Sequence, residues 1–139
     1  MRHNIIFYIP DDMIRYTYDI SAEETLIRGN AIASGDEAYD KEIEDELISR
    51  VNNGDIWAWF SFQVKAFLYV YNATIDEYKT FVGKSSWLGC CSYQSYDDFV
   101  SDTHQRSGMD EEAFDDLKKV VANYIAQNPL DRIVAVTEM

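Results

Sequence analysis

The chain has 139 residues, 47% of them hydrophobic, and its 25 acidic and 12 basic residues give a formal net charge of −13 at pH 7. This apolar content is enough for one hydrophobic core, which excludes a disordered acidic tail and favours a single domain over residues 1–139. The strong negative charge disfavours contact with nucleic acid or a membrane surface and favours a basic partner.

The first third of the chain is predicted to hold a strand, an extended segment and a helix. Residues 4–9 form an apolar run that Pro10 ends, and residues 13–20 contain several β-prone side chains. The apolar run is too short for a signal peptide or a transmembrane helix, which favours a cytoplasmic protein. Residues 21–24 (Ser-Ala-Glu-Glu) have the pattern of a capping box and predict a helix that ends near Ala33.

A second helix is predicted from Asp36 to Asn52. Its apolar residues recur at helical spacing, and Asn53-Gly54 tolerates the left-handed backbone that often ends a helix. Seven acidic side chains crowd onto residues 36–46 of this helix, where Lys41 is the one basic residue: Asp36, Glu37, Asp40, Glu42, Glu44, Asp45 and Glu46. Like charges four residues apart destabilise a helix by about 0.2–0.5 kcal/mol per pair, so folding alone does not account for the cluster.

The acidic cluster is predicted to form two stripes along the helix. Asp36, Asp40 and Glu44 make one stripe, and Glu42 and Glu46 make the other. Successive carboxylates of a stripe would lie roughly 6 Å apart along the helix axis, a spacing comparable to that of phosphates on a nucleic-acid strand. A solvated helix face is the simpler interpretation, and a mimic of nucleic-acid phosphates is the more specific one.

The middle of the chain changes to the two-residue period of a β-strand. Residues 56–71 predict a long central strand, with Trp59 and Tyr69 on the face opposite the core. The expected core face comprises Ala58, Phe60, Phe62, Val64, Ala66, Leu68 and Val70. An antiparallel meander follows, with strands at 77–82 and 87–93 and turns at 72–76 and 83–86.

Trp59 and Tyr69 are candidate anchors for a protein partner, because Trp and Tyr are over-represented among the residues that dominate interfaces. Aromatic residues on a sheet also stack on single-stranded nucleic acid, but only Lys65, Lys79 and Lys84 supply positive charge in this region. Core packing is the simplest interpretation of the aromatic residues, and a protein contact is the second.

The last third of the chain is predicted to return to helix. Ser95 is expected to cap a short helical turn, residues 102–108 to form a polar loop, and Ser107 or Asp110 to begin an amphipathic helix. The helix dipole explains the acidic residues in its first two turns: Asp110, Glu111, Glu112, Asp115 and Asp116. Residues 132–136 predict a last edge strand.

Together these elements indicate an α+β fold. Its antiparallel sheet is expected to have three to five strands centred on residues 56–71, packed by two or three helices.

Catalysis, metal binding and cofactor binding have little support in the sequence. Cys90 and Cys91 are adjacent, which strains an ordinary disulfide, so both are expected to be reduced. A thiol site with His104 and Asp97 or Asp98 matches no known spacing, and cysteines at the end of an apolar strand are usually core residues. Neither a metal-ligand pattern nor a phosphate-binding loop occurs, which favours a non-enzymatic protein without metal or cofactor.

Two short segments of the middle block are distinctive. Residues 53–59 read Asn-Gly-Asp-Ile-Trp-Ala-Trp, residues 87–95 read Trp-Leu-Gly-Cys-Cys-Ser-Tyr-Gln-Ser, and Asp98-Phe99 follows. This block resembles small proteins encoded by bacteriophages and related mobile elements. The resemblance implies a bacterial host cell as the setting and transfers no catalytic residue. By charge and size alone, the chain is similar to DNA-mimicking anti-restriction and anti-CRISPR proteins, which block host defences.

The leading hypothesis from the sequence is an acidic, non-enzymatic phage-type protein that binds a basic surface of a nucleic-acid-handling host protein or complex. The acidic cluster is its expected contact surface, with Trp59 and Tyr69 as aromatic anchors. Charge reversal of Asp40 and Glu44 is expected to abolish binding without unfolding the domain. The alternative is an accessory protein that acts through its aromatic sheet face, as a homo-oligomer such as a dimer or as a small-molecule binder.

Overall fold

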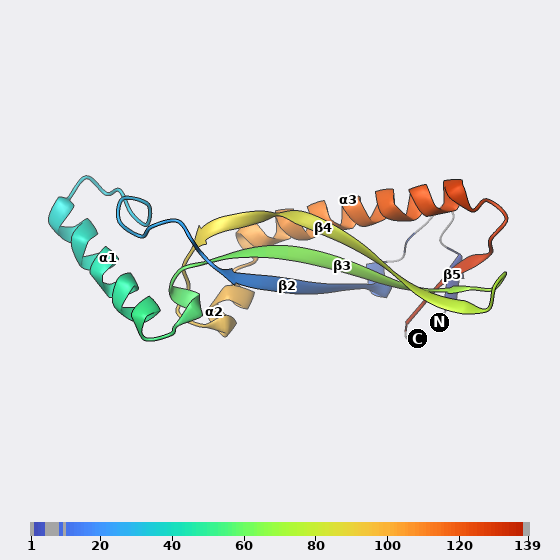
Figure 1. Ribbon diagram of the computed structural model, residues 1–139, viewed down its shortest axis with the longest axis horizontal. Coiled ribbons are helices and arrows are strands. Elements are labelled where there is room, and N and C mark those ends of the chain that lie inside the picture. The colour runs from blue at the N-terminus through green and yellow to red at the C-terminus, as the bar shows by residue number, and fades with distance from the viewer. Residues whose placement is uncertain (1, 5–8, 10, 138–139) are drawn as a thin grey trace. The chain divides into compact units, whose positions relative to one another are not determined.

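The computed structural model describes residues 2–4, 9 and 11–137, without the side chains of residues 2–4, 11 and 103–107. Five strands and three α-helices lie in this part of the chain. The strands are β1 (Arg2–Asn4), β2 (Ile14–Ala22), β3 (Phe60–Asn72), β4 (Glu77–Cys91) and β5 (Ile133–Val136), and the helices are α1 (Glu37–Asn52), α2 (Tyr96–Ser101) and α3 (Thr103–Gln127) (Figure 1). The strands form one antiparallel sheet in the order β1-β5-β3-β2, and β4 pairs with β3. The predicted α+β fold is therefore confirmed.

β3 is the centre of the sheet, as its two-residue period predicts. Alternate residues are buried, and the side chains of the core face are each at most 1% exposed: Phe60, Phe62, Val64, Ala66, Leu68 and Val70. The strand begins later than expected, because Asp55 caps a single 3₁₀ turn over Ile56–Ala58 and accepts a hydrogen bond from the Trp57 N–H at 3.1 Å.

The terminal strands pair with each other. β1 runs antiparallel to β5, with His3 opposite Ala135, and β5 pairs with the end of β3. β5 matches the strand predicted at residues 132–136, and β2 matches the predicted extended segment. Of the strand predicted at residues 4–9, Asn4 belongs to β1, and residues 5–8 lie outside the described residues.

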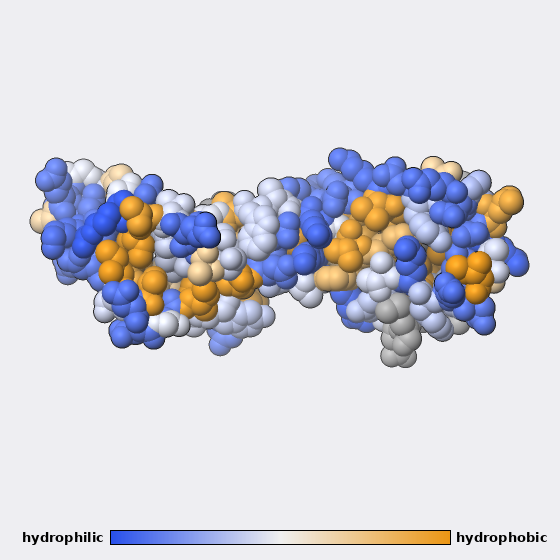
Figure 2. All heavy atoms as spheres, viewed as in Figure 1, coloured by the Kyte–Doolittle hydropathy of each residue, from blue (hydrophilic) through white to orange (hydrophobic). Residues whose placement is uncertain are grey.

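Two compact units divide the chain. Unit 1 combines Met1–Tyr18, Val64–Ser86 and Arg106–Met139, and unit 2 combines Asp19–Gln63 with Trp87–Gln105. Each unit has buried side chains of its own, among them Leu68, Phe81 and Leu117 in unit 1 and Trp59, Phe60 and Phe99 in unit 2. Hydrophobic side chains also reach the surface (Figure 2). Leu130 in unit 1 and Leu26 in unit 2 are both exposed.

β4 is one continuous strand of 15 residues, so the turn predicted at residues 83–86 is wrong. Gly83 is a strand residue whose missing side chain lets α3 come close. A Cβ atom at Gly83 would lie 2.3 Å from the Leu117 nitrogen and 2.4 Å from the Ala113 carbonyl oxygen. The glycine that looks like a turn signal in the sequence instead permits close contact between a strand and a helix.

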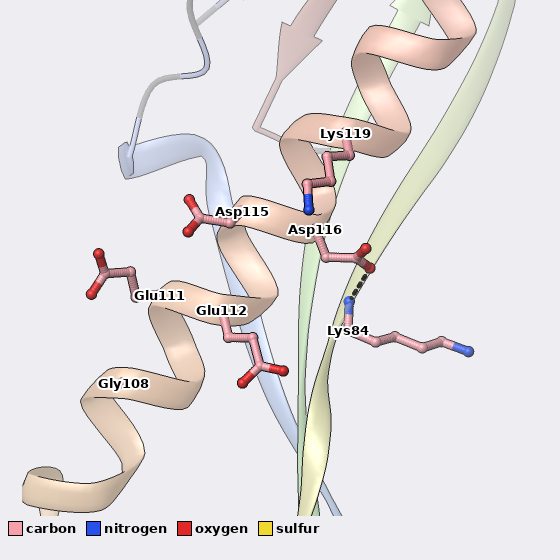
Figure 3. A pocket seen from close by; sticks show the side chains of 7 residues that line it. All are labelled: Lys84, Gly108, Glu111, Glu112, Asp115, Asp116 and Lys119. Atoms are coloured by element: carbon pink, nitrogen blue, oxygen red, sulfur yellow. Dashed lines mark hydrogen bonds between the residues drawn. The ribbon is translucent and has the colours of Figure 1, made fainter.

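Two carboxylates of α3 bind backbone N–H groups of β4 within unit 1. Asp116 accepts a hydrogen bond from the Lys84 N–H at 2.8 Å (Figure 3), and Glu112 accepts one from the Ser86 N–H at 2.6 Å. The spacing between side chains one turn apart on a helix is thus close to the spacing between N–H groups two residues apart on a strand. This pairing satisfies strand N–H groups that would otherwise be open to another chain.

Of the three α-helices, α1 and α2 begin where the sequence predicts and α3 begins earlier. α1 spans the predicted residues, and its N-cap Asp36 accepts a backbone N–H at 3.2 Å. α3 begins at Thr103, so the loop predicted at residues 102–108 is wrong. The acidic residues from Asp110 onward therefore lie beyond the first turn of α3, and the helix dipole does not account for them as expected. Ser95 caps α2, as predicted.

The helix predicted from residue 21 to about Ala33 is not formed. β2 continues through Ala22, and residues 23–36 form an irregular segment. Glu23, the residue before the glutamate that would complete the capping box, accepts a hydrogen bond from the N–H of Cys90, 67 residues further along the chain, at 2.6 Å. The capping pattern is local, and pairing of β2 within the sheet outweighs it.

Candidate partner-binding surface

The negative charge of the chain is concentrated in unit 2. This unit has 14 acidic and three basic residues, a net charge of −11, whereas unit 1 has 11 acidic and nine basic residues, a net charge of −2. The whole acidic cluster predicted as a contact surface lies in unit 2, on α1 and its N-cap. Unit 2 therefore contributes most of the negative electrostatic field of the chain.

One of the two predicted acidic stripes faces the preceding segment of the chain. The Asp40 carboxylate accepts hydrogen bonds from the Ser34 N–H at 3.2 Å and from the Ser34 hydroxyl at 2.6 Å. Glu44 is only 9% exposed, and its carboxylate accepts the Gly29 N–H at 2.7 Å. With Asp36 as the N-cap, this stripe holds the irregular segment against α1, so its acidic residues have a structural role.

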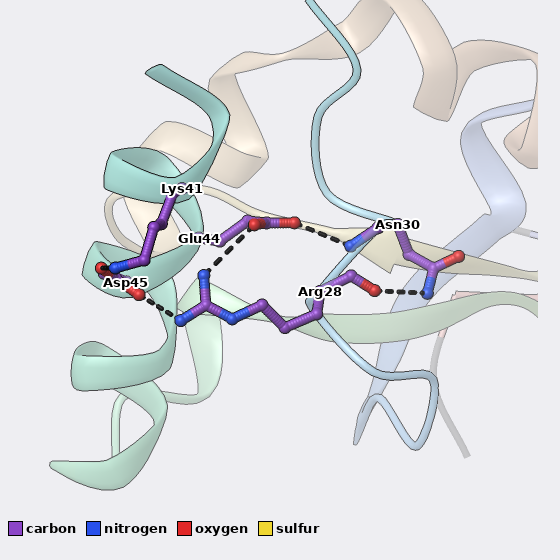
Figure 4. A network of polar contacts seen from close by, with 6 residues as sticks. Arg28, Asn30, Lys41, Glu44 and Asp45 are labelled. Atoms are coloured by element: carbon purple, nitrogen blue, oxygen red, sulfur yellow. Dashed lines mark hydrogen bonds and ion pairs between the residues drawn. The ribbon is translucent and has the colours of Figure 1, made fainter. Parts of the chain in front are cut away.

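Arg28 joins two carboxylates of α1 (Figure 4). Its Nη1 atom lies 3.2 Å from Glu44, and its Nη2 atom binds Asp45, which also pairs with the Lys41 ammonium group at 3.1 Å. The hydrogen bonds from Arg28 and then Lys41 lower the pKa of Asp45, and those to Asp45 and then Glu44 raise the pKa of Arg28. The sequence predicts no role for Arg28, because no local pattern links it to residues 16 and 17 positions away.

Three carboxylates of α1 remain for solvent or a partner: those of Glu37, Glu42 and Glu46. Each side chain is exposed, and within the described residues no hydrogen bond or ion pair engages its carboxylate. The candidate contact surface therefore narrows to these three residues. Charge reversal of Asp40 and Glu44 would remove the hydrogen bonds that these carboxylates accept, and these contacts hold the fold. This corrects the expectation that the double variant would lose binding without unfolding.

Trp59 is a core residue and not a surface anchor, which corrects its predicted role. It is 6% exposed, packs in a cluster with Ile27 and Leu47, and donates a hydrogen bond from Nε1 to the Thr25 carbonyl at 2.7 Å. Trp59 precedes β3 and does not follow the alternation of that strand. Tyr69 is half-buried within β3 and belongs to unit 1, whereas Trp59 belongs to unit 2.

The cysteines offer weak support for a nucleophilic site. Both are free thiols, and burial raises the pKa of Cys91 to about 11, which keeps this thiol protonated at neutral pH. Cys90 is exposed and has a left-handed backbone, with φ at 56°. The side chain of His104 lies outside the described residues. In the side chains that are described, no group of three His, Cys, Asp or Glu residues is placed to hold a metal ion.

A second acidic group lines a polar pocket of about 420 Å³ on α3 in unit 1 (Figure 3). Lys84 and Lys119 also line this pocket, so its charge is mixed. Asp116 and Glu112 are engaged by β4, and Asp115 pairs with the Lys118 ammonium group at 3.0 Å. This region therefore has less uncompensated negative charge than α1.

Glu23 binds the end of β4 within unit 2. Its carboxylate accepts the Cys90 N–H at 2.6 Å and the Thr25 N–H at 3.3 Å. A Cβ atom at Gly89 would lie 2.4 Å from the same carboxylate, so the glycine leaves room for the contact. The hydrogen bond from Cys90, opposed by partial burial, lowers the pKa of Glu23 below its usual value of 4.5.

We expect Glu23→Gln to destabilise unit 2 at neutral pH and to have less effect in acid. Because the folded state lowers the pKa, the carboxylate stabilises the fold above about pH 4.5 and loses this contribution as the pH falls through the folded-state pKa. Urea unfolding followed by tryptophan fluorescence, at about pH 7 and about pH 3, measures the difference. Glu24→Gln, at the neighbouring exposed position, is the control. An equal loss of stability at both pH values would contradict the expectation.

None of the helices in the described part of the chain combines the length and the apolar character that a membrane crossing requires. Comparison of the chain with protein-family models, curated proteins and solved structures finds no significant match.

Proposed function

We propose that this chain is a non-enzymatic binding protein that presents the acidic surface of unit 2 to a basic partner, a protein or complex that handles nucleic acid. The observation that carries the proposal is the set of exposed carboxylates of Glu37, Glu42 and Glu46 on a unit with a net charge of −11. Because no described residue engages these carboxylates, binding a cationic partner breaks no contact within the described part of the chain. The carboxylates take the place of phosphates, so nucleic acid competes for the same partner.

Electrostatic attraction of this kind depends on salt. The field of unit 2 steers a basic partner over distances comparable to the screening length, about 8 Å at physiological ionic strength. An exposed ion pair contributes about 0.2–1 kcal/mol, so three pairs of about 0.5 kcal/mol each are worth roughly a factor of ten in Kd. The proposal therefore requires association that weakens as salt is added.

The resemblance of residues 53–59 and 87–95 to bacteriophage proteins favours a host-defence target. A restriction nuclease or a CRISPR complex binds nucleic acid through basic surfaces, which suits an acidic competitor in the cytoplasm of a bacterial host. Action through an aromatic sheet face has less support, because Trp59 is buried and held by Thr25.

Replacing Glu37, Glu42 and Glu46 together by glutamine is expected to weaken partner binding about tenfold and to reduce its dependence on salt. Glutamine and glutamate have similar helix propensities, so α1 should keep its structure. The partner is captured from bacterial lysate at low salt on the immobilised chain, identified by mass spectrometry and purified. Its Kd is then measured against salt concentration, with and without competing duplex DNA.

The matched control changes the same amount of charge at exposed positions of unit 1, through Glu77→Gln, Glu111→Gln and Asp115→Asn. This control variant is expected to bind as the unchanged chain does. Equal weakening by both sets of changes would assign binding to net charge alone. Binding that ignores the α1 changes, salt and DNA would overturn the proposal.

A further inference from the structure

An apolar groove of about 280 Å³ lies in unit 2, between residues 23–28 and α1. Ile48 and Val51 of α1 line it together with Leu26 and Trp59. Trp59 is a fixed part of this groove, because its indole N–H donates a hydrogen bond to the Thr25 carbonyl and its ring packs in the local core. The groove therefore has a rigid aromatic side chain in its lining.

Two aliphatic side chains of the groove are open to solvent. Leu26 is 76% exposed, and Val51 is 42% exposed. Figure 2 shows hydrophobic side chains gathered at the surface in the region of α1. Single exposed aliphatic residues are common on proteins, but here two of them border a concave site that also contacts a core tryptophan. This combination fits an apolar side chain of a partner.

The charge around the groove selects the class of partner. Glu23 and Glu24 line it, and Glu24 is exposed. Arg28 also lines the groove, but Glu44 and Asp45 compensate its charge. The surrounding unit has a net charge of −11. A segment rich in Lys and Arg complements these surroundings, and an acidic segment is repelled.

We infer that this groove binds an apolar anchor residue of a basic protein segment. The inference rests on the proposed function and names the apolar contact that the carboxylates of α1 lack. Exposed ion pairs supply long-range attraction and modest affinity, whereas a buried apolar anchor supplies most of the energy at typical interfaces. The α1 carboxylates then attract a basic partner, and the groove binds its apolar anchor residue.

The test uses the full chain and two synthetic peptides. In the first, lysines and arginines flank two leucines, and in the second the leucines are replaced by glycine. The first peptide is expected to shift the NMR signal of the Trp59 indole N–H, which is assigned with Trp59→Phe, and to bind about tenfold more tightly than the second. Leu26→Ser is expected to remove this tenfold advantage, since Leu26 is the most exposed apolar side chain of the groove. The matched control is Leu130→Ser, an exposed leucine of unit 1.

The outcomes separate the groove from the proposed function. If both peptides bind equally, or Leu26→Ser and Leu130→Ser have the same effect, the groove inference is wrong, and salt-dependent partner binding through α1 stands on its own test. A neutral peptide with the same leucines that binds as tightly as the basic one would overturn the basic partner class. A Trp59 shift that grows with protein concentration in the absence of peptide would assign the groove to a second copy of the chain and overturn the inference.

Discussion

Gly83→Ala is expected to lower the free energy of unfolding of unit 1 by about 3 kcal/mol. The added Cβ atom would meet the backbone of α3, at 2.3 Å from the Leu117 nitrogen and 2.4 Å from the Ala113 carbonyl oxygen. These atoms belong to a helix backbone, and Ala113 and Leu117 are fully buried, so no flexible side chain can move aside. The substitution must push α3 away from β4, which also stretches the hydrogen bonds from β4 to Glu112 and Asp116.

Gly108→Ala is the matched control for this change. Gly108 lies within α3, and a Cβ atom there meets nothing within 4 Å. Alanine should therefore stabilise α3 by roughly 0.5–1 kcal/mol, the opposite sign from Gly83→Ala. Denaturant unfolding followed by far-ultraviolet circular dichroism measures both variants, since α3 contributes much of the helical signal. Similar midpoints for the two alanine variants would show that the close contact between β4 and α3 is not the reason for the glycine.

The sequence predicts well those elements whose conformation is determined by neighbouring residues in the chain. The alternation along β3 is uninterrupted, so its core face follows directly from Phe60 to Val70. α1 carries its own start and stop residues, Asp36 at the N-cap and Gly54 with φ at 84° after its end. In these cases the preferred local conformation and the packing in the fold agree.

The errors arise where a distant part of the chain decides the outcome. Gly83 is typical of a turn in the sequence, but in the fold it lets α3 lie beside β4. Residues 21–24 have the pattern of a capping box, but β2 continues through Ala22 and the Glu23 carboxylate binds the Cys90 N–H. A glycine is as typical of a turn as of a close contact between elements, and a glutamate is as typical of a helix cap as of a contact with a distant strand. Neither contact leaves a pattern within a short window of sequence, because the partners are far apart along the chain.

The acidic cluster illustrates the same limit at the candidate site. Composition locates the negative charge on α1 but does not show which carboxylates are engaged by the segment that precedes the helix. Asp40 and Glu44 bind backbone N–H groups of Ser34 and Gly29, whereas Glu42 on the same helix is free of such contacts among the described residues. The groove beside α1 depends on Leu26 and Val51 in non-adjacent segments, so the helical pattern alone does not reveal it.

Phe99→Ala is expected to lower the free energy of unfolding of unit 2 by about 3–5 kcal/mol. The ring of Phe99 is 1% exposed and lies at the centre of an aromatic cluster in unit 2. Its centroid is 4.9 Å from that of Phe62, 5.4 Å from Tyr93, 5.6 Å from Phe60 and 5.7 Å from Trp57. Truncation removes contacts with four rings at once and leaves a cavity that rigid aromatic neighbours fill poorly.

Tyr96→Ala tests whether the loss comes from the cluster and not from the helix. Tyr96 lies on the same helix, α2, but is 54% exposed, and among the described residues its ring contacts that of Trp57 alone, at 5.6 Å between centroids. Its removal should therefore cost less than about 1 kcal/mol. Trp57, Trp59 and Trp87 all belong to unit 2, so tryptophan fluorescence during urea unfolding reports on this unit. Alanine has a higher helix propensity than phenylalanine or tyrosine, so helix propensity cannot explain a loss in either variant. Equal losses for the two variants would show that the ring contacts of Phe99 are not the reason. A large loss for Phe99→Ala alone would establish that the aromatic cluster stabilises the unit that carries α1, the candidate partner-binding surface.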